Sequence, residues 1–128
     1  MTVNTRSQKL AQKAHACIEQ RKADSSAKEF GEYIGFAKKF PALVHTCGLA
    51  QAVAFALAKK EVRSHYAADL ASVLSAGGHT EITDATSLAE HTRADTVSSY
   101  LRLSRDAIDA AVWLKRYAEA LGEEAAGA

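Results

Sequence analysis

The stretch from Tyr100 to Leu121 constrains the fold more than any other, because it contains neither Gly nor Pro and so has no helix breaker. At about 100° per residue, apolar side chains occupy one wide sector of the predicted helix. Its members are Val97, Tyr100, Leu101, Ala107, Ile108, Ala111, Val112, Leu114 and Ala118. A sector this wide needs several covering helices, so the segment is expected at the centre of a bundle.

Composition favours helices throughout and excludes several classes of protein. The chain has 128 residues, 48% of them hydrophobic, with only one Pro. We therefore expect one helical domain over residues 1–128, frayed at 1–3 and 122–128. No apolar run is long enough to span a membrane, and the polar N-terminus does not resemble a signal peptide. Two cysteines without a secretory context indicate a reducing, cytoplasmic location with free thiols, which are expected to be small core residues.

Capping patterns and breakers predict about six helices in an all-α bundle. Helices are expected over about 4–23, from the Ser26/Glu29 capping box to about 39, over 41–47, 49–60 and 63–76, then a short helix and the long terminal one. Pro41 is expected to begin a segment or to kink it, and Gly48 to break the chain. A second capping box is predicted at Ser87 and Glu90. Asp95 is expected to cap the terminal helix. Gly31 and Gly35 are expected to allow the close approach of another helix.

Charge is unevenly distributed along a chain whose net charge is +1. Residues 1–60 carry ten Lys or Arg and four Asp or Glu, whereas residues 61–128 carry six and eleven. In the first helix, Arg6, Lys9 and Lys13 form a basic ridge that could follow a phosphate backbone. An ordinary solvated face explains the ridge equally well.

Catalytic and metal sites find little support. The pairs His15/Cys17 and His45/Cys47 are two residues apart and would point away from each other on a helix, so no metal site is predicted. Asp106 and Asp109 could be an acid/base pair, but ion pairs with Arg102 and Arg105 four residues earlier explain them. Without a phosphate-binding loop or a nucleophile motif, no catalytic residues and no cofactor are expected. The sequence does not exclude a pocket in which His65 meets Tyr66, or one in which His91 meets Arg93.

Three blocks of the sequence resemble the small helical subunit of type III-B CRISPR effector complexes, the fifth protein of the Cmr module. They run over residues 6–14, 40–59 and 99–120. Their most specific parts are Pro41 followed by Gly48 and Leu49, and the Trp-Leu-Lys-Arg run at 113–116. The interval 63–95 resembles the family only in its helical sequence pattern.

This resemblance implies a non-catalytic structural subunit in antiviral defence. Copies would stack into a short filament beside other Cmr subunits and help to hold the duplex of guide and target RNA. The contact would be sequence-independent, because basic side chains bind phosphates while base pairing reads the sequence. The candidate RNA-binding residues are Arg6, Lys9, Lys13, Lys38, Lys39, Lys115 and Arg116. For Lys38 and Lys39 a helix-dipole role is the alternative, and Lys115 could border the core.

Trp113 and Tyr117 are candidates for a subunit contact. Trp113 points about 150° from the centre of the apolar sector, so it is either exposed for a partner or buried by another helix. The rival function is a stand-alone helical adaptor that binds only protein.

Overall fold

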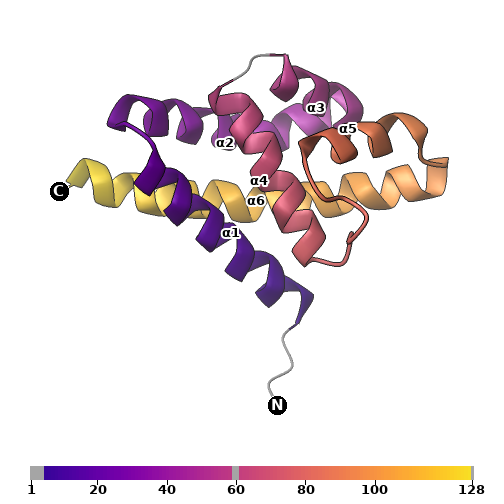
Figure 1. The fold of residues 1–128 in the computed structure, drawn as a ribbon, viewed down its shortest axis with the longest axis horizontal. Helices are drawn as coiled ribbons and strands as arrows, with labels where there is room; N and C mark the ends of the chain where they lie inside the picture. The colour runs from indigo at the N-terminus through magenta and orange to yellow at the C-terminus, as the bar shows by residue number, and fades with distance from the viewer. Residues whose placement is uncertain (1–4, 59–60, 128) are drawn as a thin grey trace.

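The computed structural model describes the backbone of residues 5–58 and 61–127 and the side-chain surroundings of residues 5–58 and 61–122. Six helices follow one another, and no strand occurs in these ranges (Figure 1). Their bounds are α1 Arg6–Asp24, α2 Ala27–Cys47, α3 Leu49–Leu57, α4 Val62–Ala76, α5 Ala85–Ala94 and α6 Val97–Gly127. The predicted all-α bundle of about six helices is confirmed. None of the described helices is long and apolar enough to cross a membrane.

Helix α6 is the longest element and packs against α1, α2 and α4. Figure 1 shows it running along the length of the molecule, with α2 beside it and α1 and α4 crossing it. Its buried residues are Leu103, Ala107, Ala110, Ala111, Leu114 and Ala118. Two residues of the predicted sector, Val97 and Leu101, are instead 76% and 56% exposed. The prediction was wrong for them because a helical wheel gives a direction but not where the covering helices end.

Helix starts are set by local hydrogen bonds. The Ser26 hydroxyl accepts from the Glu29 amide and the Glu29 carboxylate accepts from the Ser26 amide, which confirms this capping box. These bonds lower the pKa of Glu29 below its ordinary value. A further box joins Thr5 and Gln8 at the start of α1.

Two predicted caps were wrong by a few residues. The box before α5 joins Asp84 and Ser87, not Ser87 and Glu90, because the helix begins one turn earlier than its sequence pattern suggests. At the start of α6, the Thr96 hydroxyl accepts from the Ser99 amide. Asp95 is engaged by His91 instead and so does not cap α6.

Helix α2 continues through Pro41 to Cys47, so of the two alternatives for Pro41 the start of a new segment was wrong, and the kink stays a prediction. Proline removes one backbone hydrogen bond from a helix interior. Here its ring is buried with the apolar face of α2, which offsets part of that loss. The chain breaks at Gly48, where φ is 85° and ψ is 161°, a conformation that suits only glycine.

The close approaches that glycine permits occur elsewhere than predicted. A Cβ atom at Gly31 or Gly35 would meet no atom within 4 Å, so the predicted close approach at these residues was wrong within this chain. A Cβ atom at Gly77 would lie 2.6 Å from Leu10 Cδ2, and one at Gly122 would lie 2.5 Å from Ile34 Cδ1. These glycines let α1 pack beside the end of α4, and α2 beside the end of α6.

The two cysteines differ, although both were expected in the core. Cys17 is partly buried against the core, whereas Cys47 is exposed at the end of α2. Asn4, Lys59 and Lys60, which the sequence places in helices, lie outside the described residues, as do residues 1–3, for which fraying is expected. The α6 backbone is helical to Gly127, and the fraying expected at 122–128 stays a prediction.

Candidate functional site

The basic residues of α1 divide between two sides of the helix. Lys9 and Lys13 are exposed one turn apart and border a hollow of about 280 Å³ with Gln12, Ala16 and Ala76. This hollow follows the seam between α1 and the end of α4. The two lysines therefore present their charges along a groove that solvent reaches.

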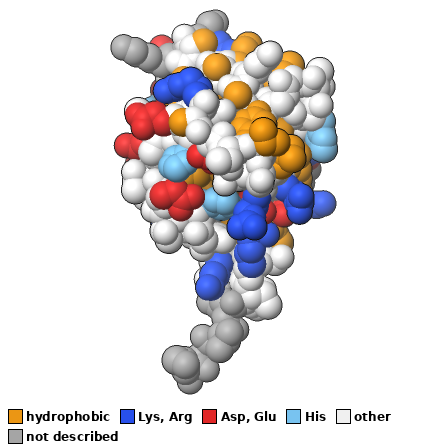
Figure 2. All heavy atoms as spheres, turned by 90° about the vertical axis from the view of Figure 1, so that its right-hand side faces the viewer, with side chains coloured by type: hydrophobic (Ala, Val, Ile, Leu, Met, Phe, Trp, Pro, Cys, Tyr) orange, Lys and Arg blue, Asp and Glu red, His pale blue; other side chains and the backbone are white. Residues whose placement is uncertain are grey.

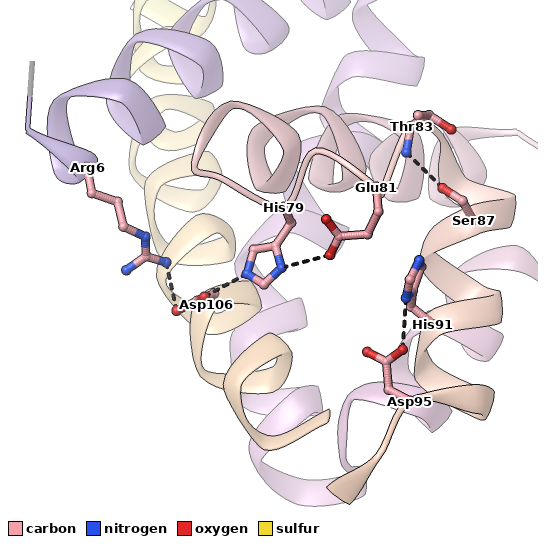
Figure 3. A network of polar contacts seen from close by, with 8 residues as sticks. All are labelled: Arg6, His79, Glu81, Thr83, Ser87, His91, Asp95 and Asp106. Atoms are coloured by element: carbon pink, nitrogen blue, oxygen red, sulfur yellow. Dashed lines mark hydrogen bonds and ion pairs between the residues drawn. The ribbon is translucent and has the colours of Figure 1, made fainter. Parts of the chain in front are cut away.

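Arg6 is tied to α6 instead. Its guanidinium lies 2.7 Å from Asp106 Oδ1 and 3.8 Å from Asp109 Oδ2 (Figure 3). Among the described residues, Arg102 and Arg105 form no ion pair with these carboxylates, so the predicted pairs within α6 were wrong. Pairs within one helix contribute only a few tenths of a kcal/mol, so a partner brought from another helix displaces them easily. Arg6 keeps 45% of its side chain exposed, but its charge is largely compensated.

A polar cavity of about 510 Å³ lies next to this ion pair. His79 stands between two carboxylates, with Nε2 2.7 Å from Asp106 and Nδ1 3.6 Å from Glu81 (Figure 3). On the far wall, His91 Nδ1 lies 2.8 Å from Asp95 Oδ1. Sequence reasoning missed this cluster, because the loop after α4 and the starts of α1 and α6 meet only in the folded chain.

The cavity brings together two imidazoles and the carboxylates that hold them, and Ser99 and Arg102 also line its wall. Among the described residues, no group of three His, Cys, Asp or Glu side chains is arranged to hold a metal ion. The two residue pairs that the sequence allows to share a pocket do not face each other. His65 is exposed whereas Tyr66 is fully buried, and Arg93 is exposed whereas His91 faces Asp95.

The other candidate cations lie on α2 and α6. Lys38 and Lys39 are exposed in the middle of α2, so the alternative in which they complement the helix C-terminus was wrong. On α6, Arg116 is exposed and Lys115 is partly buried. The seven candidate cations thus belong to three helices. Of these seven, Lys9 and Lys13 line the same hollow, at the seam between α1 and α4.

Trp113 and Tyr117 lie together, as their spacing of four residues predicts. Their rings stack with centroids 5.8 Å apart, and His15 of α1 meets Tyr117 edge-on at 5.0 Å. Trp113 and Tyr117 are partly buried against the core. Tyr117 also borders a hollow between α1 and α6 with Gln8, Ala11 and His15. Both roles weighed from the sequence, core packing and subunit contact, stay compatible with this half-buried pair.

A buried ion pair joins three helices and had no signal in the sequence. Asp69 of α4 is 6% exposed, receives two hydrogen bonds of 3.0 Å from Arg21 of α1, and accepts one of 2.6 Å from the Tyr33 hydroxyl of α2. Burial, and then the charge of Asp69, raise the pKa of Tyr33. The hydrogen bond to Asp69 raises the pKa of Arg21. Asp69 therefore holds α1, α2 and α4 together.

Comparison with known proteins gives one consistent result. Residues 6–121 match the model of the family described as CRISPR-associated protein (Cas_Cmr5). The CRISPR system Cmr subunit Cmr5 of Thermus thermophilus is 41% identical over 123 residues, which are 95% of this chain and 100% of that relative. The crystal structure of a CRISPR-associated Cmr5 family protein from the same organism matches with a TM-score of 0.80 at 41% identity, covering 93% of this chain and 98% of that one.

Proposed function

Because the chain belongs to the Cmr5 family of CRISPR-associated proteins, we propose that it is a non-catalytic small subunit of a type III-B CRISPR effector complex. Its partners are the other Cmr subunits and further copies of itself, which stack beside the guide and target RNA in the cytoplasm. The observation that carries this proposal is the match over residues 6–121, together with 41% identity to a protein named as a Cmr subunit.

The histidines of the polar cavity have a structural role in this proposal. His79 pairs with Asp106 of α6, and His91 pairs with Asp95 at the end of its own helix. These pairs tie the loop after α4 to α6 and close α5 onto its own end.

We infer that Lys9 and Lys13 make the principal RNA contact. They are exposed, one turn apart, and border the seam between α1 and α4. Lysine side chains on a solvent-accessible groove can bind phosphates without reading bases. Arg6 contributes less, because Asp106 and Asp109 already neutralise it. Lys38, Lys39, Lys115 and Arg116 remain secondary candidates for the same kind of contact.

The rival function is an adaptor that binds only protein, and an affinity pull-down of the tagged full chain from its host separates the two. Recovery of a guide RNA with several larger CRISPR subunits would support the proposed role. Recovery of the chain alone, or with proteins unrelated to CRISPR and no guide RNA, would contradict it. A tag at the C-terminus leaves α1 and its lysines accessible.

A further inference from the structure

An aromatic ring is held open to solvent beside a groove between α2, the end of α3 and the start of α4. The ring of Phe55 is 49% exposed and lies nearly parallel to that of Phe36, at 17° with centroids 6.2 Å apart. The Arg63 guanidinium lies over the Phe55 ring, 4.4 Å from its centroid. Phe55 is thus fixed in orientation by two neighbours. We call Phe36, Phe55 and Arg63 the stacking platform.

The groove beside the stacking platform has the size of a small-molecule site. Its volume is about 540 Å³, and ligand pockets commonly measure about 300–1,000 Å³. Besides the platform, its lining consists of Glu32, Gly35, Lys39, Glu61 and Val62. The groove therefore combines apolar surface with charges of both signs.

Gly35 keeps one wall of the groove low. It lies in the interior of α2, where glycine is less favourable than alanine because it loses more conformational freedom on folding. A Cβ atom there would meet no atom within 4 Å, so packing among the described residues does not require glycine. The space left by the missing side chain is open to a ligand that approaches the helix backbone.

Charges of opposite sign stand at the two ends of the groove along α2. Glu32 and Lys39 are exposed and lie two turns apart, a rise of about 10 Å. Helix residues that pair with each other are three or four positions apart, so these two charges are too distant for such a pair. Their separation is comparable to the length of a nucleotide from the edge of its base to its phosphate.

This lining discriminates between classes of occupant. A purely apolar segment would cover Glu32, Lys39 and Glu61 without offering their charges a partner, which is unfavourable. A simple polyanion would meet two carboxylates. A nucleotide combines a flat ring, hydrogen-bond donors on the ring edge and an anionic group, and so has a counterpart for each feature of the groove.

The other exposed apolar side chains lack this combination. Val97 and Leu101 are 76% and 56% exposed, but they are aliphatic and offer no ring on which a base can stack. They belong to the start of α6, and Figure 2 shows that side of the molecule, where hydrophobic side chains lie next to a cluster of Lys and Arg. Of the three large hydrophobic residues exposed in the described part of the chain, Phe55 alone is aromatic.

We propose that this groove binds an unpaired guanine nucleotide. The base stacks on the platform, since unpaired bases stack well on aromatic rings and guanidinium planes. Guanine carries two neighbouring donors, N1–H and the N2 amino group, which suit the two oxygens of the Glu32 carboxylate. Lys39 binds the phosphate. The site uses only residues of this chain, so it does not depend on the proposed role in a CRISPR complex.

NMR titration of the isotope-labelled full chain with guanosine monophosphate (GMP) tests the site. Amide signals around the groove should shift with a Kd of about a millimolar or below, because one stacked base and one phosphate give modest affinity. Gly35→Met, which fills the groove, should weaken binding at least tenfold. Gly31→Met is the matched control, because Gly31 is equally open but does not line the groove. Melting temperatures verify that both variants are folded.

Substitutions of single side chains separate stacking from phosphate binding. Phe55→Leu keeps an apolar group without the ring, and Arg63→Lys keeps the charge without the planar guanidinium, so each should weaken GMP binding several-fold. Lys39→Ala should weaken the binding of GMP but not of guanosine, which has no phosphate. Lys38→Ala, exposed but outside the groove, should change neither.

Base preference tests the contact at the ring edge. Adenine presents one amino group beside a ring nitrogen that accepts hydrogen bonds, so adenosine monophosphate should bind at least fivefold more weakly than GMP. Glu32→Gln should reduce this preference, because an amide has one acceptor oxygen instead of two. Equal affinity of the unaltered chain for both monophosphates would overturn the proposal.

A short uridine strand with one guanosine distinguishes the two sources of the nucleotide. Tighter binding of this strand than of GMP, lost when a complementary strand pairs the guanosine, supports the site as one for an unpaired RNA base. Binding of GMP at least as tight as that of the strand supports it as one for a free nucleotide. In both cases Gly35→Met should abolish the difference.

Three results would overturn the proposal. They are the absence of shifts at about 10 mM GMP, equal losses in Gly31→Met and Gly35→Met, and larger shifts of the same amides with a phenylalanine-containing peptide than with GMP. The last result would make the groove a protein-docking face.

The proposed function fails or holds independently of this site. Lys9→Ala with Lys13→Ala should leave GMP binding unchanged, because neither lysine lines the groove. Recovery of guide RNA and larger subunits in the pull-down, without GMP binding, would refute only the nucleotide site. GMP binding by a chain that recovers neither would refute only the proposed function.

Discussion

At the scale of single residues, Asp69 has the most consequential surroundings. Its carboxylate is buried and accepts hydrogen bonds from Arg21 and Tyr33, so three helices depend on one side chain. A buried ion pair is not by itself a strong source of stability, because desolvation offsets much of the attraction. Removing one partner is costly, since the other charge is left without compensation.

We therefore expect Asp69→Ala to lower the free energy of unfolding by about 3 kcal/mol or more. Urea denaturation monitored by circular dichroism measures the change. Asp109→Ala is the control, because the Asp109 side chain is 54% exposed and its ion pair with Arg6 is long, at 3.8 Å. This variant should change the free energy of unfolding by less than about 0.5 kcal/mol. A loss below about 1 kcal/mol for Asp69→Ala would contradict this account.

Alkaline pH should destabilise the fold. Burial raises the pKa of the Cys17 thiol to about 11, and burial also raises the pKa of Tyr33 and Tyr66. A raised folded-state pKa gives stability that is present below the unfolded pKa and is lost as pH rises through the folded value. For Cys17 that window runs from about pH 9 to about pH 11.

Melting temperatures measured from pH 8 to pH 11 should accordingly be flat at first and fall above about pH 9, as the thiol begins to ionise in the unfolded chain. Cys17→Ala should remove the part of the fall that belongs to the thiol, while Cys47→Ala should leave the curve unchanged because Cys47 is exposed. A melting temperature that stays constant to pH 11 would refute the burial argument.

At the scale of elements, helix ends show how far local chemistry reaches. Ser26 and Glu29 form their box from neighbours in the sequence, and the pattern predicts it. The start of α3 has no such local cap, and its Ala50 amide donates to the Tyr100 hydroxyl of α6 at 3.0 Å. This contact spans a large part of the chain, so no local pattern predicts it.

Gly48 and Tyr100 offer a test of this junction. Gly48→Ala should cost about 1–3 kcal/mol, because φ of 85° with ψ of 161° disfavours any side chain. Tyr100→Phe should cost about 1 kcal/mol, since the Ala50 amide loses its acceptor. Both losses are measured by chemical denaturation. A Gly48→Ala variant as stable as the unaltered chain would show that the junction adapts.

At the scale of the whole molecule, the uneven charge of the sequence is partly neutralised by folding. Arg6 from the basic half meets Asp106 and Asp109 from the acidic half. Lys9 and Lys13, one and two turns further along α1, stay exposed along the seam with α4. Of the three residues in the predicted basic ridge, Arg6 is therefore ion-paired, and Lys9 and Lys13 present their charges to solvent.

The contrast between the ion-paired Arg6 and the exposed Lys9 and Lys13 predicts different effects of their substitution on RNA binding. Lys9→Ala with Lys13→Ala should reduce the affinity for a generic RNA duplex and lower the slope of log affinity against log salt by about 1–2, whereas Arg6→Ala should change both less. Fluorescence anisotropy between about 50 and 200 mM salt measures both quantities. Lys28→Ala with Arg93→Ala, which removes the same charge elsewhere on the exposed surface, is the control. Equal effects from the two double variants would argue for diffuse attraction rather than an α1 contact.

The family of the chain could be predicted from three sequence blocks, and the family match over residues 6–121 confirms it. The candidate site was less accessible to sequence reasoning. Exposure of Lys9 and Lys13 follows from helical periodicity, but the partners of Arg6 and His79 come from segments about a hundred and about thirty residues away, respectively. Such pairs have no signature in a single sequence.

The sequence by itself determined the helices, their apolar faces and the capping box at Ser26, because these depend on residues within a few turns of one another. Tertiary structure alone decided that Val97 and Leu101 stay uncovered, that Gly35 borders an open groove, and that Asp69 joins three helices. The physical reason is that burial, ion pairing and close approach depend on which distant helix covers a face. That choice is made by packing all six helices at once.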